Sequence, residues 1–226
     1  MLYKLAALGG GLEFLRDRQY YIISLAIIFL AIAFFMVSFE KKKPREREVV
    51  ILAVLTAIAV VGRVIFFMVP QFKPCAAVVI IVGVMLGKQA GFLCGALTAF
   101  VSDFFFGQGP WTPWQMVALG LIGFLAAMLF YGKRESLANN KWILCGFGFL
   151  ATFVLYGLLM DTATVFMQVK DPSPGAFIAA YISGIVFNLI HGISTVVFLW
   201  ILSPQLIKKI KRIKMKYGVF LHNKNI

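Results

Sequence analysis

The sequence predicts an all-α membrane protein whose helices cross the bilayer several times. Hydrophobic residues make up 61% of the 226 residues, the mean hydropathy is +0.90, and only 14% of the residues are charged. A soluble globular domain usually carries about 25% charged residues. The apolar runs do not alternate with polar residues, as the strands of a transmembrane β-barrel would. We therefore expect a polytopic helical membrane protein.

Seven apolar stretches are candidates for spanning helices, since a span needs roughly 20 apolar residues. In chain order they are residues 20–39, 49–70, 75–87, 89–106, 114–131, 142–167 and 175–203. The third is short, so it is expected to be tilted, partly re-entrant, or continuous with the fourth. The first ends in Ser-Phe-Glu-Lys without a small-residue cleavage site. We interpret it as a retained anchor rather than a signal peptide.

Basic residues are concentrated in three segments that follow the first span, the fifth span and the last span. They are Lys41, Lys42, Lys43, Arg45 and Arg47; then Lys133, Arg134 and Lys141; then Lys208, Lys209, Lys211, Arg212, Lys214 and Lys216. The positive-inside rule places these segments in the cytoplasm, with the N-terminus outside and the C-terminus inside. The net charge of +13 therefore indicates contact with anionic lipid rather than with nucleic acid.

The chain has few ionisable groups within its apolar spans. Because such groups are costly in a bilayer, each is a candidate functional residue. They are Arg63, Asp103, Asp161 and His191. The arginine and both aspartates fall toward the outer ends of their spans, which favours one polar cavity that opens outward. Snorkelling or internal ion pairing is the alternative for Arg63 and Asp161, and a packing role is the alternative for His191.

The outer loops, around residues 66–75, 102–116 and 168–177, combine prolines with aromatic side chains. Proline restricts the backbone, and rigid loops with rings and a few polar groups suit a mostly apolar ligand with polar edges. An interfacial aromatic belt is the alternative. The candidate substrate-binding or gating residues are Arg63, Phe67, Phe72, Lys73, Asp103, Phe106, Gln108, Trp111, Trp114, Gln115, Asp161 and His191.

Small residues recur at helical spacing in four of the spans. Ala53 and Ala57 are one turn apart, Gly83, Gly87, Gly91 and Gly95 repeat every four residues, and Gly120, Gly123 and Ala127 follow. Such spacing lets helix backbones approach closely in lipid. Ordinary packing within the protein is the alternative to a docking role.

The sequence contains no familiar catalytic or metal-binding motif. An HExxH zinc motif is absent, the chain has two histidines, and its three cysteines lack metal-ligand spacing. "GVMLGKQ" resembles a phosphate loop only loosely. We therefore expect no catalytic residues, no metal and no cofactor. An intramembrane enzyme that uses Asp103 and Asp161 remains an alternative, although the flanking residues are unlike those of that class.

Three stretches in order resemble the substrate-binding S component of energy-coupling factor (ECF) vitamin transporters. They are "GRVIFFMVPQFKP" (62–74), "SDFFFGQGPWTPWQMVALGLIGFLAA" (102–127) and "NLIHGISTVVFLWIL" (188–202). The resemblance covers about residues 49–203 and is nearest to the subgroup that includes the cobalamin S components. It implies a six-helix core that captures a vitamin outside, docks on a transmembrane coupling subunit with two ATPases, and releases the vitamin inward.

The same resemblance implies the domain organisation and the docking residues. Residues 49–204 match the six-helix core in a prokaryotic plasma membrane, and Ala53 and Ala57 match the family's AxxxA docking motif. Residues 1–48 depart from the family pattern, adding an amphipathic lead, one extra transmembrane helix and a basic linker. Residues 205–226 form a basic cytoplasmic tail.

The resemblance leaves the ligand open. Cobalamin is the best guess, and another vitamin, a cobalamin precursor or a tetrapyrrole remain alternatives. A stand-alone secondary transporter is the alternative function, although such proteins often show repeated halves and this chain has no convincing internal repeat. A scaffold without any ligand is a further alternative.

Overall fold

The computed structural model describes residues 45–220 and scattered positions between residues 22 and 37. Within these ranges every regular element is a helix, which confirms the all-α fold class. The N-terminal lead and most of the first expected span lie outside the described residues.

The six core spans expected from the sequence are confirmed as helices. Their bounds, with those of the short helices between them, are α3 (Glu46–Ile65), α4 (Cys75–Leu86), α5 (Lys88–Phe106), α6 (Thr112–Phe130), η1 (Gly132–Arg134), α7 (Glu135–Ala138), α8 (Lys141–Leu150), the π-helical η2 (Ala151–Tyr156), α9 (Gly157–Gln168) and α10 (Pro174–Tyr217). Because α8, η2 and α9 are continuous, they form one apolar segment of 28 residues.

Five of the described helical segments are long and apolar enough to cross a membrane, namely α3, α5, α6, the α8–α9 segment and α10. The short α4 has 12 residues, and all of them are buried. A helix that is apolar on every side is expected to be surrounded by protein, as α4 is. Gly87 separates α4 from α5 with a φ of 98°, a conformation that L-residues with a side chain rarely adopt. Thus α4 is a distinct helix and not a continuation of α5.

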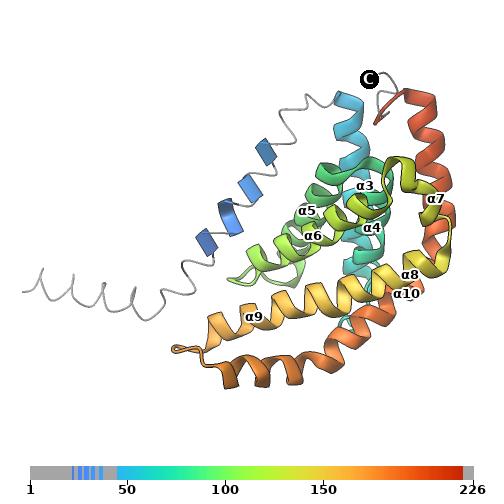
Figure 1. The fold of residues 1–226 in the computed structure, drawn as a ribbon. Helices are drawn as coiled ribbons and strands as arrows, with labels where there is room; N and C mark the ends of the chain where they lie inside the picture. The colour runs from blue at the N-terminus through green and yellow to red at the C-terminus, as the bar shows by residue number, and fades with distance from the viewer. Residues whose placement is uncertain are drawn as a thin grey trace, which may run out of the picture.

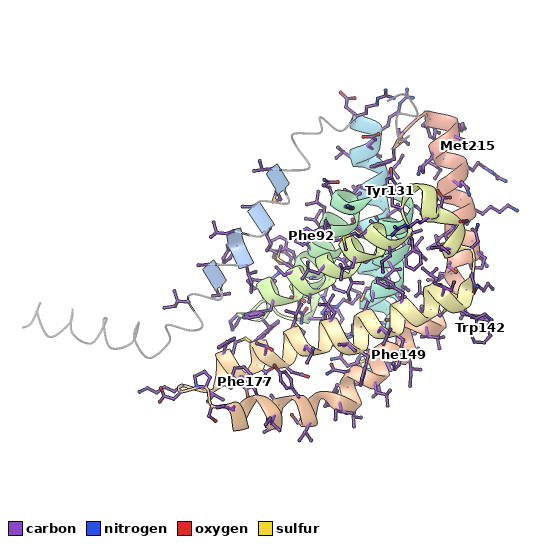
Figure 2. The ribbon with its side chains drawn as sticks, viewed as in Figure 1. Phe92, Tyr131, Trp142, Phe149, Phe177 and Met215 are labelled. Carbon is purple, nitrogen blue, oxygen red and sulfur yellow. The ribbon has the colours of Figure 1, made fainter. Side chains whose placement is uncertain are left out.

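The helices pack as a bundle around α4 (Figure 1). The long α8–α9 segment crosses the bundle on one side, and α10 runs back beside it, bends, and continues alongside α7 (Figure 1). The side chain of Phe92 lies fully buried within the bundle, whereas Trp142 and Met215 project from its surface (Figure 2).

The last helix extends 14 residues beyond the expected end at residue 203, through Tyr217. Pro204 lies inside it, where the missing N–H removes one helical hydrogen bond without ending the helix. Ile207 and Ile210, three residues apart, are buried in the core. This amphipathic spacing explains why the basic tail continues as a helix.

The two ends of the bundle differ in composition. At one end, called here the basic end, Arg45, residues 131–141 and residues 208–220 come together. Arg45 Nη1 donates to the carbonyl of Gly218 at 3.2 Å, and Lys214 Nζ donates to the carbonyl of Met85 at 2.7 Å. At the other end, the loop end, residues 66–74 and 107–111 connect α3 to α4 and α5 to α6. Most of the chain's described cations therefore lie far from these two loops.

Glycines allow α4, α5 and α6 to touch backbone to backbone. A Cβ added at Gly83 or at Gly91 would collide with the carbonyl oxygen of Gly123, and one added at Gly123 would collide with the carbonyl of Gly91. Gly95 meets the backbone of α6 in the same way. These glycines therefore serve packing within the protein. Such packing was the alternative to a docking role in the sequence analysis.

We expect Gly123→Ala to lower the melting temperature of the detergent-solubilised protein. The new methyl would overlap backbone atoms that cannot rotate away, and overpacking of this kind costs about 1–3 kcal/mol. Gly146→Ala is the matched control, because a Cβ there meets nothing within 4 Å. Equal melting temperatures for the two variants would contradict this account of the α4–α5–α6 contact.

Candidate functional site

A buried ion pair joins α3 to α5 near the loop end. Arg63 Nη1 lies 2.9 Å from Asp103 Oδ1, and the two side chains are 8% and 1% exposed. Leaving either charge buried without the other would be strongly unfavourable, so the two must be present together. This pairing is the internal ion pair that the sequence left open for Arg63, and its partner is Asp103 rather than Asp161.

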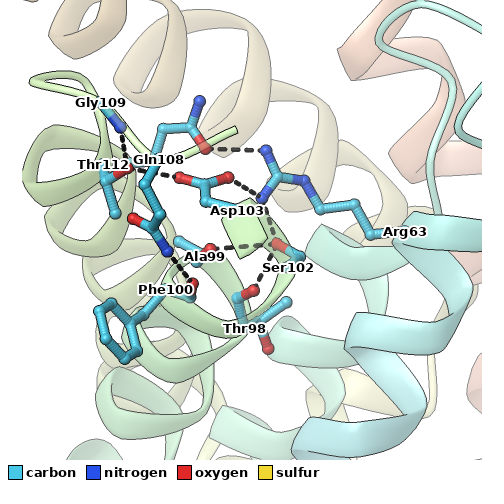
Figure 3. A network of polar contacts seen from close by, with 10 residues as sticks. Arg63, Thr98, Ala99, Phe100, Ser102, Asp103, Gln108, Gly109 and Thr112 are labelled. Atoms are coloured by element: carbon cyan, nitrogen blue, oxygen red, sulfur yellow. Dashed lines mark hydrogen bonds and ion pairs between the residues drawn. The ribbon is translucent and has the colours of Figure 1, made fainter. Parts of the chain in front are cut away.

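Further polar groups complete the network around the pair (Figure 3). Arg63 also donates to Ser102 Oγ and, through Nη2, to Gln115 Oε1 at 2.7 Å. Thr112 Oγ1 donates to the second carboxylate oxygen of Asp103 at 2.9 Å. Because Thr112 begins α6 and Gln115 lies in its first turn, the network ties α3, α5 and α6 together at one level.

A cavity of about 240 Å³ lies beside this network at the loop end. Seven of the candidate residues named from the sequence line it: Arg63, Lys73, Asp103, Phe106, Trp111, Gln115 and His191. Four other residues complete its wall: Gln71, Cys75, Leu119 and Tyr156. Charged, amide and aromatic groups from α3, α5, α6, η2, α10 and both loops therefore converge on one space.

Two cations flank the ring of Phe106. The guanidinium carbon of Arg63 lies 4.8 Å from the ring centroid, and the ammonium of Lys73 lies 4.4 Å from it. Burial, and then repulsion from Arg63, lowers the pKa of Lys73 below its usual value. The charged form of Lys73 is therefore less favoured here than that of a lysine in water.

The loop between α3 and α4 is held over the cavity by contacts with α10. Ser194 Oγ donates to the carbonyl of Lys73 at 3.1 Å, and Phe198 packs against Phe66 and Phe72 with ring centroids 5.2 and 5.3 Å away. Gln71 has a φ of 57°, which is uncommon for a residue other than glycine and turns the chain back toward the site.

His191 and Tyr156 close the side of the cavity formed by η2 and α10. Their rings meet edge to face at 4.7 Å between centroids, and both residues are buried. The Nδ1 atom of His191 has no hydrogen-bond partner among the described residues. A buried polar atom without a partner is costly, so a ligand that supplied one would gain binding energy there.

Five candidates from the sequence lie outside the cavity. Phe67 packs on Phe106 and is half exposed, Phe72 packs on Phe198, and Gln108 Nε2 donates to the carbonyl of Phe100. Trp114 is buried against Phe166 and does not line the cavity. Asp161 accepts from Asn188 Nδ2 at 2.9 Å in a separate groove between α9 and α10.

Three lining residues, Cys75, Leu119 and Tyr156, were not proposed as site residues from the sequence. Each stands within or beside an apolar run that gives no sign of which residues face inward. Only the hydroxyl of Tyr156, in the middle of a span, is a polar signal that could have identified one of them.

Among the described residues, no group of three histidine, cysteine or acidic side chains could hold a metal ion.

Ala53 and Ala57 are exposed on α3, on a face that also presents Val50, Val54 and Val61.

The comparisons with known proteins agree with the resemblance seen in the sequence. The family model of the ECF-type riboflavin transporter S component matches residues 44–209. A UPF0397 protein of Vibrio atlanticus (strain LGP32) is 28% identical over 116 residues, which are 49% of this chain and 63% of that protein. A UPF0397 protein of Aliivibrio fischeri (strain MJ11) is 31% identical over 87 residues, 36% of this chain and 47% of that protein.

These alignments span less than two thirds of the length of those curated relatives. No solved structure matches the chain significantly. The family model covers every described helix except the end of α10, and it supports the ECF S-component resemblance without supporting the cobalamin-type subgroup. Its members are transport components and not enzymes, in agreement with the absence of catalytic motifs. The chain therefore belongs to the family of ECF-type riboflavin transporter S components, the substrate-binding membrane subunits of vitamin-type ECF transporters.

Proposed function

We propose that this protein captures its vitamin in the cavity beside the Arg63–Asp103 pair. The observation that carries the proposal is the wall of that cavity, where the hydrogen-bonded Arg63–Asp103 network lies next to aromatic rings and an unpartnered histidine nitrogen. Binding sites for small molecules typically combine apolar and aromatic walls with a few placed polar groups. The loop end faces outward, so that residues 66–74 and 107–111 cover the vitamin after capture.

Riboflavin is the vitamin that we propose as the ligand. Its planar ring system has one edge of alternating donors and acceptors, and its side chain carries hydroxyl groups. Phe106, Trp111 and Tyr156 offer faces or edges for such a ring, while Gln115, Gln71 and His191 offer hydrogen-bonding partners. The family model names riboflavin as well.

Cobalamin, the vitamin favoured by the sequence, is the second candidate. A cavity of about 240 Å³ is small beside the usual 300–1,000 Å³ of ligand pockets. A corrinoid with its fringe of amides would require the two loops to move far apart. The cavity size therefore supports the smaller vitamin.

The difference in composition between the basic end and the loop end also supports an orientation in the membrane and a route for delivering the vitamin. With the basic end in the cytoplasm, the positive-inside rule is satisfied in a prokaryotic plasma membrane, and the N-terminus lies outside. The exposed face of α3 with Ala53 and Ala57 docks on the coupling subunit, whose two ATPases supply the energy. Small side chains allow close helix contact there, and the surrounding valines supply apolar surface.

Titration of the purified protein with riboflavin, followed by quenching of flavin fluorescence, tests the ligand and its site. We expect saturable binding that Trp111→Ala weakens by about tenfold, because the indole lines the cavity. Trp142→Ala is the matched control, since that indole is 76% exposed at the basic end. A parallel titration with cobalamin distinguishes the two vitamins.

Binding of cobalamin but not riboflavin would replace the ligand and keep the transport role. Equal affinities for the two tryptophan variants would contradict the site. Failure of a full vitamin panel, with a protein that melts cooperatively, would contradict vitamin capture itself.

Replacing Ala57 with leucine tests the docking face. Ala57→Leu leaves riboflavin affinity unchanged, because the residue is remote from the cavity, but it reduces co-purification with the coupling subunit and ATP-dependent uptake by tenfold or more. Ala179→Leu on α10 is the control, since it adds the same bulk to another exposed alanine. Normal uptake with Ala57→Leu would exclude this face of α3 as the docking surface.

A further inference from the structure

A second polar cavity lies at the basic end, remote from the vitamin site. Its volume is about 300 Å³, and it lies between the α7–α8 turn and the last third of α10. Asn139 and Lys141 line it from the turn, and Ser203, Lys208 and Lys211 line it from α10. Lys208 and Lys211 are three residues apart, so they occupy one face of the helix.

The charge of this cavity is positive. Lys141, Lys208 and Lys211 line it, and the carboxylate of Glu135 lies 2.8 Å from the ammonium of Lys211. One carboxylate cannot neutralise three cations, so a net positive charge remains. Asn139 and Ser203 add neutral polar groups to the lining. An anion is therefore the complementary ligand.

Tryptophans mark the depth of the cavity in the membrane. Trp142 and Trp200 meet edge to face with ring centroids 5.0 Å apart, and Lys141 Nζ lies 4.9 Å from the centroid of the Trp200 ring. Trp142 points out from the bundle (Figure 2) and is 76% exposed. Tryptophan collects at the boundary between hydrocarbon and water, where lipid headgroups lie. Lys141 precedes Trp142 in the chain, and Lys208 and Lys211 lie about two and three helical turns beyond Trp200 on α10.

We propose that this cavity binds the phosphate headgroup of an anionic phospholipid, with Lys141, Lys208 and Lys211 as its cationic ligands. Basic pockets between helices at the cytoplasmic side suit such headgroups, and each nearby lysine strengthens binding to an anionic membrane. The exposed apolar surface around Trp142, Trp200 and Ile201 provides the path for the acyl chains. The bound lipid ties the end of α10 to the α7–α8 turn.

The test compares two triple variants of the full chain that remove the same charge. The pocket variant is Lys141→Gln, Lys208→Gln and Lys211→Gln. The control variant is Lys209→Gln, Arg212→Gln and Lys216→Gln, whose three side chains are exposed and lie outside the cavity. Each protein is purified from bilayers of phosphatidylcholine mixed with phosphatidylglycerol, and the retained lipid is counted by native mass spectrometry.

We expect the wild type and the control variant to retain phosphatidylglycerol in preference to phosphatidylcholine, and the pocket variant to lose that preference by roughly tenfold or more. Equal losses in the two variants would overturn the proposal, because they would show diffuse attraction rather than a site. Inorganic phosphate would also overturn the proposal if it raised the melting temperature of the wild type as much as phosphatidylglycerol does, since the ligand would then be a free anion.

Melting in pure phosphatidylcholine shows whether the pocket variant is folded. If it is not, the single change Lys208→Gln, compared with Lys209→Gln next to it, repeats the same test. The site would again be contradicted if Lys208→Gln retained as much phosphatidylglycerol as Lys209→Gln, or more.

Discussion

The structure depends on the ion pair between Arg63 and Asp103. An arginine and an aspartate inside an apolar bundle would each be very unfavourable alone, and removal of one partner from such a buried pair costs about 3–5 kcal/mol. The pair fixes α3 against α5, and its hydrogen bonds to Thr112 and Gln115 bring α6 to the same level. The walls of the cavity are thereby set before any ligand arrives, and a preorganised site loses less entropy on binding.

Much of the fold could be predicted from the sequence, because long apolar runs separated by polar segments have one stable form in a bilayer. Arg63 and Asp103 could also be identified from the sequence, because charged groups within apolar spans are costly in a bilayer. The direction in which each aromatic ring points could not be predicted. Trp111 lines the cavity, whereas Trp114, three residues later, is buried against Phe166. Trp114 is buried in one cluster with Ala163 and with Ile28 and Ile32, which precede the residues that the family model covers.

The two ends of the bundle are suited to different surroundings. The loop end gathers aromatic rings and a neutralised charge pair around a small cavity, which suits an uncharged vitamin with polar edges. The basic end gathers lysines and arginines beside the Trp142–Trp200 pair, and we propose that this composition suits anionic lipid on the cytoplasmic side. Between them, glycines of α4, α5 and α6 make a tight centre. The face of α3 with Ala53 and Ala57 is exposed, and it is the face that we propose for docking.

A structure of the protein saturated with riboflavin tests the central claim most directly. We predict that the flavin ring will lie against Phe106 and Trp111, with a polar edge of the ligand within hydrogen-bonding distance of His191 or Gln115, and with the Arg63–Asp103 pair unbroken. A flavin bound elsewhere, for example in the groove beside Asp161 and Asn188, or a ligand that separates Arg63 from Asp103, would contradict the account.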